Sequence, residues 1–400
     1  MSTYKSNTLM KICLLLGCSL LVMGNAAIGP SLTQINQVFN DPFYVSLLMT
    51  LPAIGVVLSA PFVDKLMRLV GEKNALLVGL FIYGAAGSSG LWLNSIYALL
   101  YFRLLFGVGI AICMTVINHI IGSAFQGKSR TDFISFQSIA VNLGGVVFVL
   151  LSGSLAEYNW RFPFSLYLLS FVILIMSAKA ITIPTHRDDE IKKRLTGSDI
   201  KRVFPSYVMG LIGMLFYYMI LINLPFTLVS SLSLTSRMIG IVMAGMSVLS
   251  VIVAYLFRHM LSTLGERWLL VICFSCYAIA LTLLALTQFE WRAYVTIVFS
   301  GIGFGLLLPT LSHMIMSLST AVLRARLMSG FVMSYFLGQA LSAFVLQLNM
   351  LLPEGLVFLI FAMIAAITAC LCARFLDIKE PKEEALKVRE NDVCFGKNFS

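Results

Sequence analysis

Long apolar stretches separated by short charged segments follow one another along the whole chain. A helix needs about 20 mainly apolar residues to cross a bilayer, because lipid offers the backbone N–H and C=O groups no partner. Stretches of that length predict twelve membrane-spanning helices, at about 12–31, 43–63, 74–94, 97–121, 133–156, 162–178, 206–228, 238–257, 268–288, 293–317, 327–350 and 355–373. The pattern therefore predicts an all-α integral membrane protein.

The composition supports this assignment. Of the 400 residues, 59% are apolar and 12% are charged, whereas about 25% of the residues in an ordinary soluble domain are charged. Lys5 and Lys11 precede the first apolar run, as in a secretory signal peptide, but this run is longer than the apolar core of such a signal. We therefore expect the first helix to be retained.

The positive charges predict the orientation in the membrane. If both termini are cytoplasmic, that side contains 24 of the 28 Lys and Arg residues, the opposite side contains Arg161, Arg237 and Arg292, and Arg103 lies inside a span. Cytoplasmic loops of membrane proteins carry such an excess of Lys and Arg. Topology thus explains the net charge of +10. Basic clusters such as that at 192–194 are expected to face anionic lipid, not nucleic acid.

One charged segment occurs twice. The sequence "VGEKNALLVGLFIY" at 70–83 returns as "LGERWLLVICFSCY" at 264–277, which places Gly71 on Gly265 with an offset of 194 residues. The same offset carries Gly107, Gly109, His119, Arg130 and Gly144 onto Gly301, Gly303, His313, Arg324 and Gly338. The chain therefore reads as two copies of a six-helix unit.

This duplication predicts the domain organisation. We expect a six-helix bundle at 1–178, a cytoplasmic linker at 179–205, a second six-helix bundle at 206–376 and a charged cytoplasmic tail at 377–400. Two related bundles leave a seam at the bilayer midplane, and rocking them about that seam exposes a site to one side and then the other. The repeat therefore indicates a carrier.

Three motifs resemble those of the major facilitator superfamily. The segment "APFVDKLMRLVGEK" resembles the family's loop pattern G-x-x-x-D-[RK]-x-G-x-[RK] through Asp64, Lys65, Gly71 and Lys73, although Gly71 follows Asp64 by seven residues where the family usually has three. The fourth-helix pattern R-x-x-x-G-x-G is matched by Arg103, Gly107 and Gly109, and "WRFPF" at 160–164 is similar to the family's W-R-x-x-F. The chain also departs from the family: Ala60 replaces the first loop glycine, Arg258 stands where Asp64 would repeat, and Phe148-Val149 replace the Gly-Pro of proton-driven exporters.

The resemblance implies a twelve-helix carrier of the bacterial efflux type. Such a carrier would export a small amphipathic or anionic organic compound, a drug or a metabolite, in exchange for protons. Uptake of a small organic solute by the same fold is the alternative, which the missing Gly-Pro favours. A membrane enzyme or a receptor is a more distant alternative, because no cluster of His, Asp, Ser or Cys lies near one interface.

The expected partners follow from this assignment. We expect a small-molecule substrate, protons and the lipid bilayer of the bacterial inner (cytoplasmic) membrane. We expect no nucleic acid, no cofactor and no metal, and we expect a monomer. The glycine-rich segments near 107 and 301 lack the Lys-Ser pair of a nucleotide loop. Small-residue helix packing explains those glycines better.

Three ionisable residues are the sharpest candidates for function. Arg103 is the one charged residue inside a predicted span, and such residues usually line a cavity or meet a partner. Snorkelling to the headgroups is its alternative, whereas the family resemblance implies a cavity position that couples substrate to protonation. His119 and His313 occupy equivalent positions in the two halves. They are candidates for proton or ligand binding, with structural histidines as the alternative.

The resemblance also implies a gate and a central cavity. Asp64, Lys65, Gly71 and Lys73 would form the gate, in which the Asp64 carboxylate caps the eleventh helix near 325–329. A topology charge near the membrane interface is the alternative for Asp64. Helices 1, 4, 7 and 10 would line the cavity, with contributions from helices 5 and 11. The polar candidates there are Asn25, Asn118, Tyr217, Tyr218, Asn223, Ser312, Asn142 and Gln339. Each could instead satisfy the backbone of a neighbouring helix.

Overall fold

The computed structural model describes residues 8–375, except 126, 182–196, 287–290, 320–322, 349–350 and 354. Every regular element in this part of the chain is helical. The first half contains α1 (Thr8–Ala26), η1 (Gly29–Ser31), α2 (Leu32–Phe39), α3 (Pro42–Val70), α4 (Glu72–Gly87), η2 (Ser88–Leu91), α5 (Ile96–Ala124), α6 (Gly127–Tyr158), η3 (Phe162–Leu168) and α7 (Leu169–Ala180). The second half contains α8 (Gly197–Leu232), α9 (Ser236–Ala285), α10 (Arg292–Leu318), α11 (Arg324–Gln347) and α12 (Leu356–Phe375).

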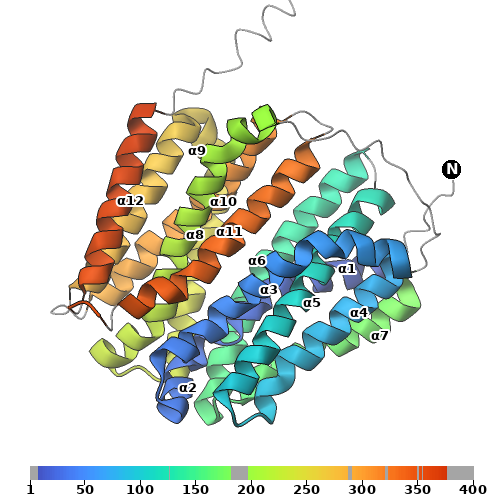
Figure 1. The fold of residues 1–400 in the computed structure, drawn as a ribbon, viewed down its shortest axis with the longest axis horizontal. Coiled ribbons are helices and arrows are strands. Elements are labelled where there is room, and N and C mark those ends of the chain that lie inside the picture. Colours follow the sequence, from blue (N-terminus) through green and yellow to red (C-terminus); the bar gives the residue numbers. More distant parts are fainter. Residues whose placement is uncertain are drawn as a thin grey trace, which may run out of the picture.

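The two halves form separate helical bundles that lie side by side (Figure 1). The blue-to-green helices α1–α7 make up one bundle and the lime-to-red helices α8–α12 make up the other. The expected linker lies largely outside the described residues, as does the expected tail. The helix α8 begins at Gly197, within the segment expected to be the linker.

Eleven helices in the described part are long and apolar enough to cross a membrane. One of them, α9, has 50 residues, and Gly265 interrupts it with a non-helical backbone (φ 75°, ψ 166°). A helix of that length would span about 75 Å, more than twice the hydrocarbon thickness. The break at Gly265 therefore divides α9 into two crossing segments, and the prediction of an all-α membrane fold is confirmed.

The repeated charged segment forms the same elbow in both halves. Gly71 ends α3 and precedes α4 with φ 81° and ψ 158°, close to the values at Gly265. Residues with a Cβ atom rarely adopt this conformation, so glycine is needed at both turns. A glutamate, Glu72 or Glu266, follows each glycine and begins the next helical segment, where a negative charge is favourable. We call the end of the molecule that carries these turns the elbow end.

The two halves meet through two pairs of helices, α3 with α11 and α6 with α9. Opposite the elbow end, Phe43 on α3 lies edge-on to Phe344 on α11, with ring centroids 6.0 Å apart. At the same end, α6 and α9 approach so closely that a Cβ atom on Gly153 would lie 2.8 Å from the Cα of Gly240. We call this the far end. Its contacts hold the halves together there.

Candidate functional site

The middle of the interface between the halves carries a polar contact. The side-chain amide of Asn25 on α1 donates a hydrogen bond to the hydroxyl of Tyr218 on α8, at 2.7 Å. Tyr217, the neighbouring residue, stacks on Phe304 of α10 with ring centroids 4.1 Å apart and an interplanar angle of 15°. The structure therefore brings Asn25, Tyr217 and Tyr218 together, as a shared site requires.

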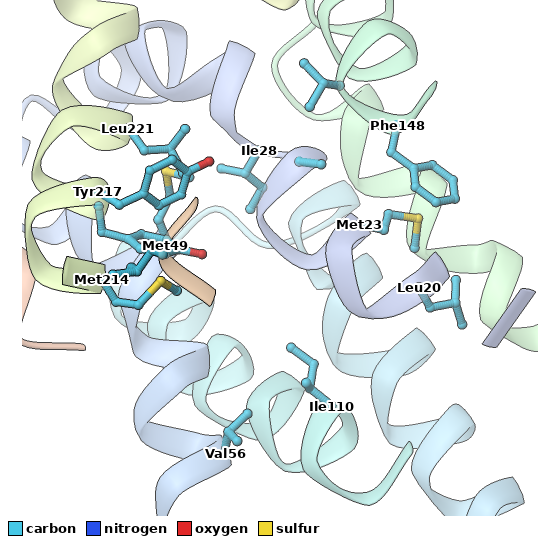
Figure 2. Close-up of a cluster of buried hydrophobic side chains, with 14 of the residues drawn as sticks. Leu20, Met23, Ile28, Met49, Val56, Ile110, Phe148, Met214, Tyr217 and Leu221 are labelled. Atoms are coloured by element: carbon cyan, nitrogen blue, oxygen red, sulfur yellow. The ribbon is translucent and has the colours of Figure 1, made fainter. Parts of the chain in front are cut away.

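Apolar side chains surround this contact. Figure 2 shows Met214, Tyr217 and Leu221 on α8 facing Ile28 and Met49 of the first half. These side chains have few fixed polar groups, and methionine repacks easily around ligands of different shape. The surroundings are suited to an amphipathic molecule.

A second polar contact joins the halves nearby. The amide of Gln339 on α11 donates to the backbone carbonyl of Met49 on α3, at 3.1 Å, and both residues are buried.

The Oδ1 atom of Asn25 is buried and, within the described part of the chain, accepts no hydrogen bond. A buried acceptor without a donor is costly. The interface therefore offers one acceptor that a solute could satisfy when the halves move.

Arg103 lies inside the first half. Its side chain is only 2% exposed, and its guanidinium donates to the hydroxyl of Tyr167 at 3.0 Å and to the carbonyl of Gly24 at 3.5 Å. The rings of Phe106, Phe164 and Tyr167 surround it, with centroids 5.1 to 5.4 Å from the guanidinium carbon. Cation–π contacts of this kind stabilise a desolvated cation.

This environment bears on both sequence-based interpretations of Arg103. A side chain enclosed by three rings does not snorkel to the headgroups, so that alternative is wrong. Arg103 does not contact Tyr217 or Tyr218 either, because it faces α1 and η3. Gly24, which it contacts, directly precedes Asn25 in the chain. Arg103 is therefore linked to the interface through α1.

The two predicted histidines lie at the elbow end, each beside the glutamate of its elbow. The Nδ1 atom of His119 on α5 lies 3.0 Å from a carboxylate oxygen of Glu72 on α4. His313 on α10 pairs in the same way with Glu266 on α9. The histidine side chains are 54% and 49% exposed, whereas the glutamates are 18% and 11% exposed. The histidines therefore lie away from the central contact.

The remaining candidates are dispersed. Asn118 lies at the elbow end, where its carbonyl oxygen accepts from the Gln137 amide at 3.2 Å. Ser312 is partly exposed on α10, and Asn142 is exposed on α6.

The residues of the proposed gate surround the elbow of the first half. Asp64 and Lys65 are exposed at the elbow end of α3. Gly71 forms the turn, and Lys73 is partly exposed on α4. Among the described residues, no group of three His, Cys, Asp or Glu side chains could hold a metal ion.

A cavity of about 410 Å³ lies at the far end. Its walls come from α2 of the first half and from α8, α9, α10 and α12 of the second. Asn223 is the predicted residue that lines it, and the amide of Asn223 also donates to the carbonyl of Met219 at 2.9 Å. Asn223 is thus separate from the Asn25–Tyr218 contact.

Sequence reasoning missed three residues of these clusters. Glu72 and Glu266 are not among the predicted site residues, although Glu72 lies between the predicted Gly71 and Lys73. The signal was present, because Glu72 and Glu266 have the same offset of 194 residues as His119 and His313. Tyr167, which bonds both Arg103 and the carbonyl of Gly24, gave no sequence signal, because its position depends on how η3 packs on α1.

Comparison with known proteins identifies the family. The sequence model of the Major Facilitator Superfamily matches residues 14–205 and again residues 206–396. The "Bacillibactin exporter" of Bacillus subtilis (strain 168) is 23% identical over 392 residues, which cover 91% of this chain and 95% of that protein. "Multidrug resistance protein 2" of the same organism is 22% identical over 280 residues, covering 65% and 68% of the two chains.

Solved structures share the fold. The nucleoside transporter NupG superposes with a TM-score of 0.74 at 14% identity, covering 93% of this chain and 99% of that chain. A D-xylose–proton symporter superposes with a TM-score of 0.72, also at 14% identity, covering 92% and 98%. The family match spans both halves, and the proteins in the comparison are transporters, not enzymes. The chain therefore belongs to the major facilitator superfamily of membrane transporters.

Proposed function

We propose that this transporter exports a small organic compound, amphipathic or anionic, in exchange for protons. The observation that carries the proposal is the Asn25–Tyr218 hydrogen bond across the middle of the two halves. Carriers built from such repeats bind their substrates at the interface between the repeats, near the bilayer midplane, and this contact lies between the two halves. Relatives named as a bacillibactin exporter and a multidrug resistance protein support the outward direction.

The Lys and Arg distribution supports the orientation. In this proposal the elbow end and both termini face the cytoplasm, because the elbows lie among the cytoplasmic loops that contain most of the 28 Lys and Arg residues. The contacts between Phe43 and Phe344 and between Gly153 and Gly240 then close the outer side. We infer that the described conformation faces inward.

Residues have distinct roles in this proposal. Asn25, Tyr217 and Tyr218 contact the solute at the interface. Arg103 positions α1 through the carbonyl of Gly24 and thereby couples solute binding to the movement of the halves. Asp64 belongs to the inner gate.

Uptake is the second candidate function. The fold is shared with a nucleoside transporter and with a D-xylose–proton symporter. The absence of the Gly-Pro step at Phe148-Val149 also favours it. Both candidates use the same interface, so they differ only in the direction of net transport.

Reconstitution in liposomes separates the candidates. Vesicles with an imposed pH gradient would be loaded with candidate solutes, and solute movement would be followed with the gradient in either direction and without it. Export by exchange predicts that solute leaves the compartment into which the elbow end opens when protons flow toward that compartment. Movement with the protons would support uptake. Solute movement that does not depend on the pH gradient would refute proton coupling.

A further inference from the structure

Each half carries one carboxylate–imidazole pair at the elbow end. In the first half the pair joins the start of α4 to the end of α5, and in the second it joins the segment after Gly265 to the end of α10. The two pairs are related by the internal repeat, because both members share the offset of 194 residues. Both halves therefore carry the pair at equivalent positions, although Arg258 stands where Asp64 would repeat.

Each pair has the geometry of a proton-binding site. An imidazole ring can take up or release a proton in the physiological pH range, where most other side chains keep a fixed charge. About half of each ring is exposed, at 54% for His119 and 49% for His313. Each pair therefore has water access for proton exchange and a fixed partner for the charged ring.

We propose that Glu72–His119 and Glu266–His313 are two equivalent proton-binding sites, one in each half, whose occupation favours the conformation in which the halves meet at the far end. This inference rests on the proposed function, because it needs a second conformation in which the elbow ends of the halves approach each other. A proton can shift that equilibrium only if it binds the two conformations with different affinity.

The surrounding charges supply that difference. Basic residues outnumber acidic ones on the helices that pack against each pair. Among the described residues, the charged or titratable residues near the elbow end of the first half are Lys11, Asp64, Lys65, Arg68, Lys73, Asp132 and Lys179. Those of the second half are Asp199, Lys201, Arg202, Arg258, His259, Arg267, Arg324, Arg326 and Arg374. Approach of the two elbow ends covers the exposed imidazoles and brings two basic regions together. A protonated pair opposes that approach, whereas a neutral ring permits it.

Glu72 and Glu266 act as positioning residues. Each holds its histidine ring at the end of a neighbouring helix and offsets the charge of the protonated ring. Replacing both by glutamine keeps the possibility of a hydrogen bond but removes the negative charge. The double glutamine variant should keep a pH response but with a different midpoint, a change that a purely structural role would not produce.

The test measures the far-end distance as a function of pH. Spin labels on Glu157→Cys and Arg237→Cys report this distance, because both residues are exposed at the far ends of α6 and α9. Cys370, which is exposed, and Cys394 are replaced by serine to avoid labelling. The full chain in lipid nanodiscs, without solute, is measured between pH 8 and pH 6. We expect the ratio of short to long distances to rise about tenfold as the pH falls, within the range usual for coupled sites.

Variants identify the group that responds. His119→Gln combined with His313→Gln should abolish the pH response, and each single variant should retain part of it. His259→Gln is the comparison variant, because His259 is an exposed histidine on α9 that belongs to neither pair, and this variant should keep most of the pH response. An unchanged response in the double variant, or none in the unaltered protein, overturns the proposal. A single distance at every pH contradicts alternating access itself, whereas two pH-independent populations refute the proton sites alone.

Discussion

Asn25 and Tyr218 belong to different halves of the transporter, and their side chains share a hydrogen bond of 2.7 Å at the middle of the interface. A rocking movement of the halves has to lengthen or break this bond. A typical intramolecular hydrogen bond contributes only about 0.5 to 1.5 kcal/mol. The contact is therefore strong enough to bias the position of the halves and weak enough to be exchanged for a solute.

Tyr218→Phe tests this relationship. The substitution removes the hydroxyl and leaves the amide of Asn25 without that acceptor, in addition to its unsatisfied Oδ1 atom. We expect a loss of stability of about 1 to 3 kcal/mol and a lower apparent affinity for transported solute. The thermal unfolding midpoint and the concentration dependence of transport in liposomes measure the two effects.

The control for this variant is Tyr255→Phe. Tyr255 lies on α9 with its side chain exposed, so the same loss of a hydroxyl should leave both stability and transport unchanged. If Tyr218→Phe also behaves like the unaltered protein, Tyr218 has no part in solute binding.

Arg103→Ala should abolish transport while the protein still inserts and folds. Alanine removes the hydrogen bonds to Tyr167 and Gly24 and empties the space between three rings. The position of α1 next to Asn25 is then no longer fixed. Arg103→Lys keeps the charge but not the planar fork of donors, and we expect it to transport slowly. Uptake or efflux assays, normalised to the amount of protein in the membrane, give the comparison.

Normal turnover by Arg103→Ala would contradict a role for Arg103 in coupling. Arg161→Ala offers a contrast at the far end, where Arg161 binds the carbonyls of Gly90 and Leu93 and the side chain of Asn94. We expect Arg161→Ala to lower the stability of the protein and to change the pH dependence of transport only slightly.

The repeated elbow was predictable from the sequence because its geometry depends on local residues. Only glycine readily adopts the backbone found at Gly71 and Gly265, and a charged segment between apolar runs has to leave the membrane. The length of the apolar runs therefore located the twelve spans, and the offset between the copies gave the equivalence of His119 with His313. These features require no knowledge of how helices pack.

The environment of Arg103 was not predictable in the same way. Hydropathy shows that an arginine lies within a span, but the three rings around it come from α5 and η3, and its acceptor Gly24 comes from α1. Which of these residues meet depends on helix rotation and on the turn at 160–164. The same holds for Asn142, which sequence reasoning placed at the cavity and the structure leaves exposed on α6.

Gly240→Ala tests whether the far-end contact holds the halves together. The added Cβ atom would lie 2.9 Å from the Cα of Gly153 and 3.1 Å from the carbonyl oxygen of Val149, and backbone atoms on α6 cannot move aside separately. The halves should separate at the far end, which shifts the population away from the described conformation. Distances between labels on Glu157→Cys and Arg237→Cys report the shift.

Gly245→Ala is the matched control for Gly240→Ala. Gly245 lies on the same helix, but a Cβ atom there would meet nothing within 4 Å. Alanine at this position should leave the distances unchanged and favour the helix slightly, by up to about 1 kcal/mol. Equal distances for both variants would mean that the contact between Gly153 and Gly240 does not determine the conformation.

Asp64→Asn should slow the transport cycle without preventing solute binding. In the described conformation Asp64 is exposed, and Leu323, which precedes α11, makes no side-chain capping bond. If the elbow ends approach during the cycle, the Asp64 carboxylate can accept hydrogen bonds from the first N–H groups of α11 and interact with the positive end of its dipole. Such contacts are typically worth about 0.3 to 2 kcal/mol. Asparagine should therefore destabilise the conformation that is closed at the elbow end and lower the turnover rate about two- to thirtyfold.

Asp132→Asn is the control, because it removes the same charge from an exposed position on α6 at the same end and should have little effect on the turnover rate. Equal turnover rates for Asp64→Asn and the unaltered protein, with solute binding also equal, would rule out the gate.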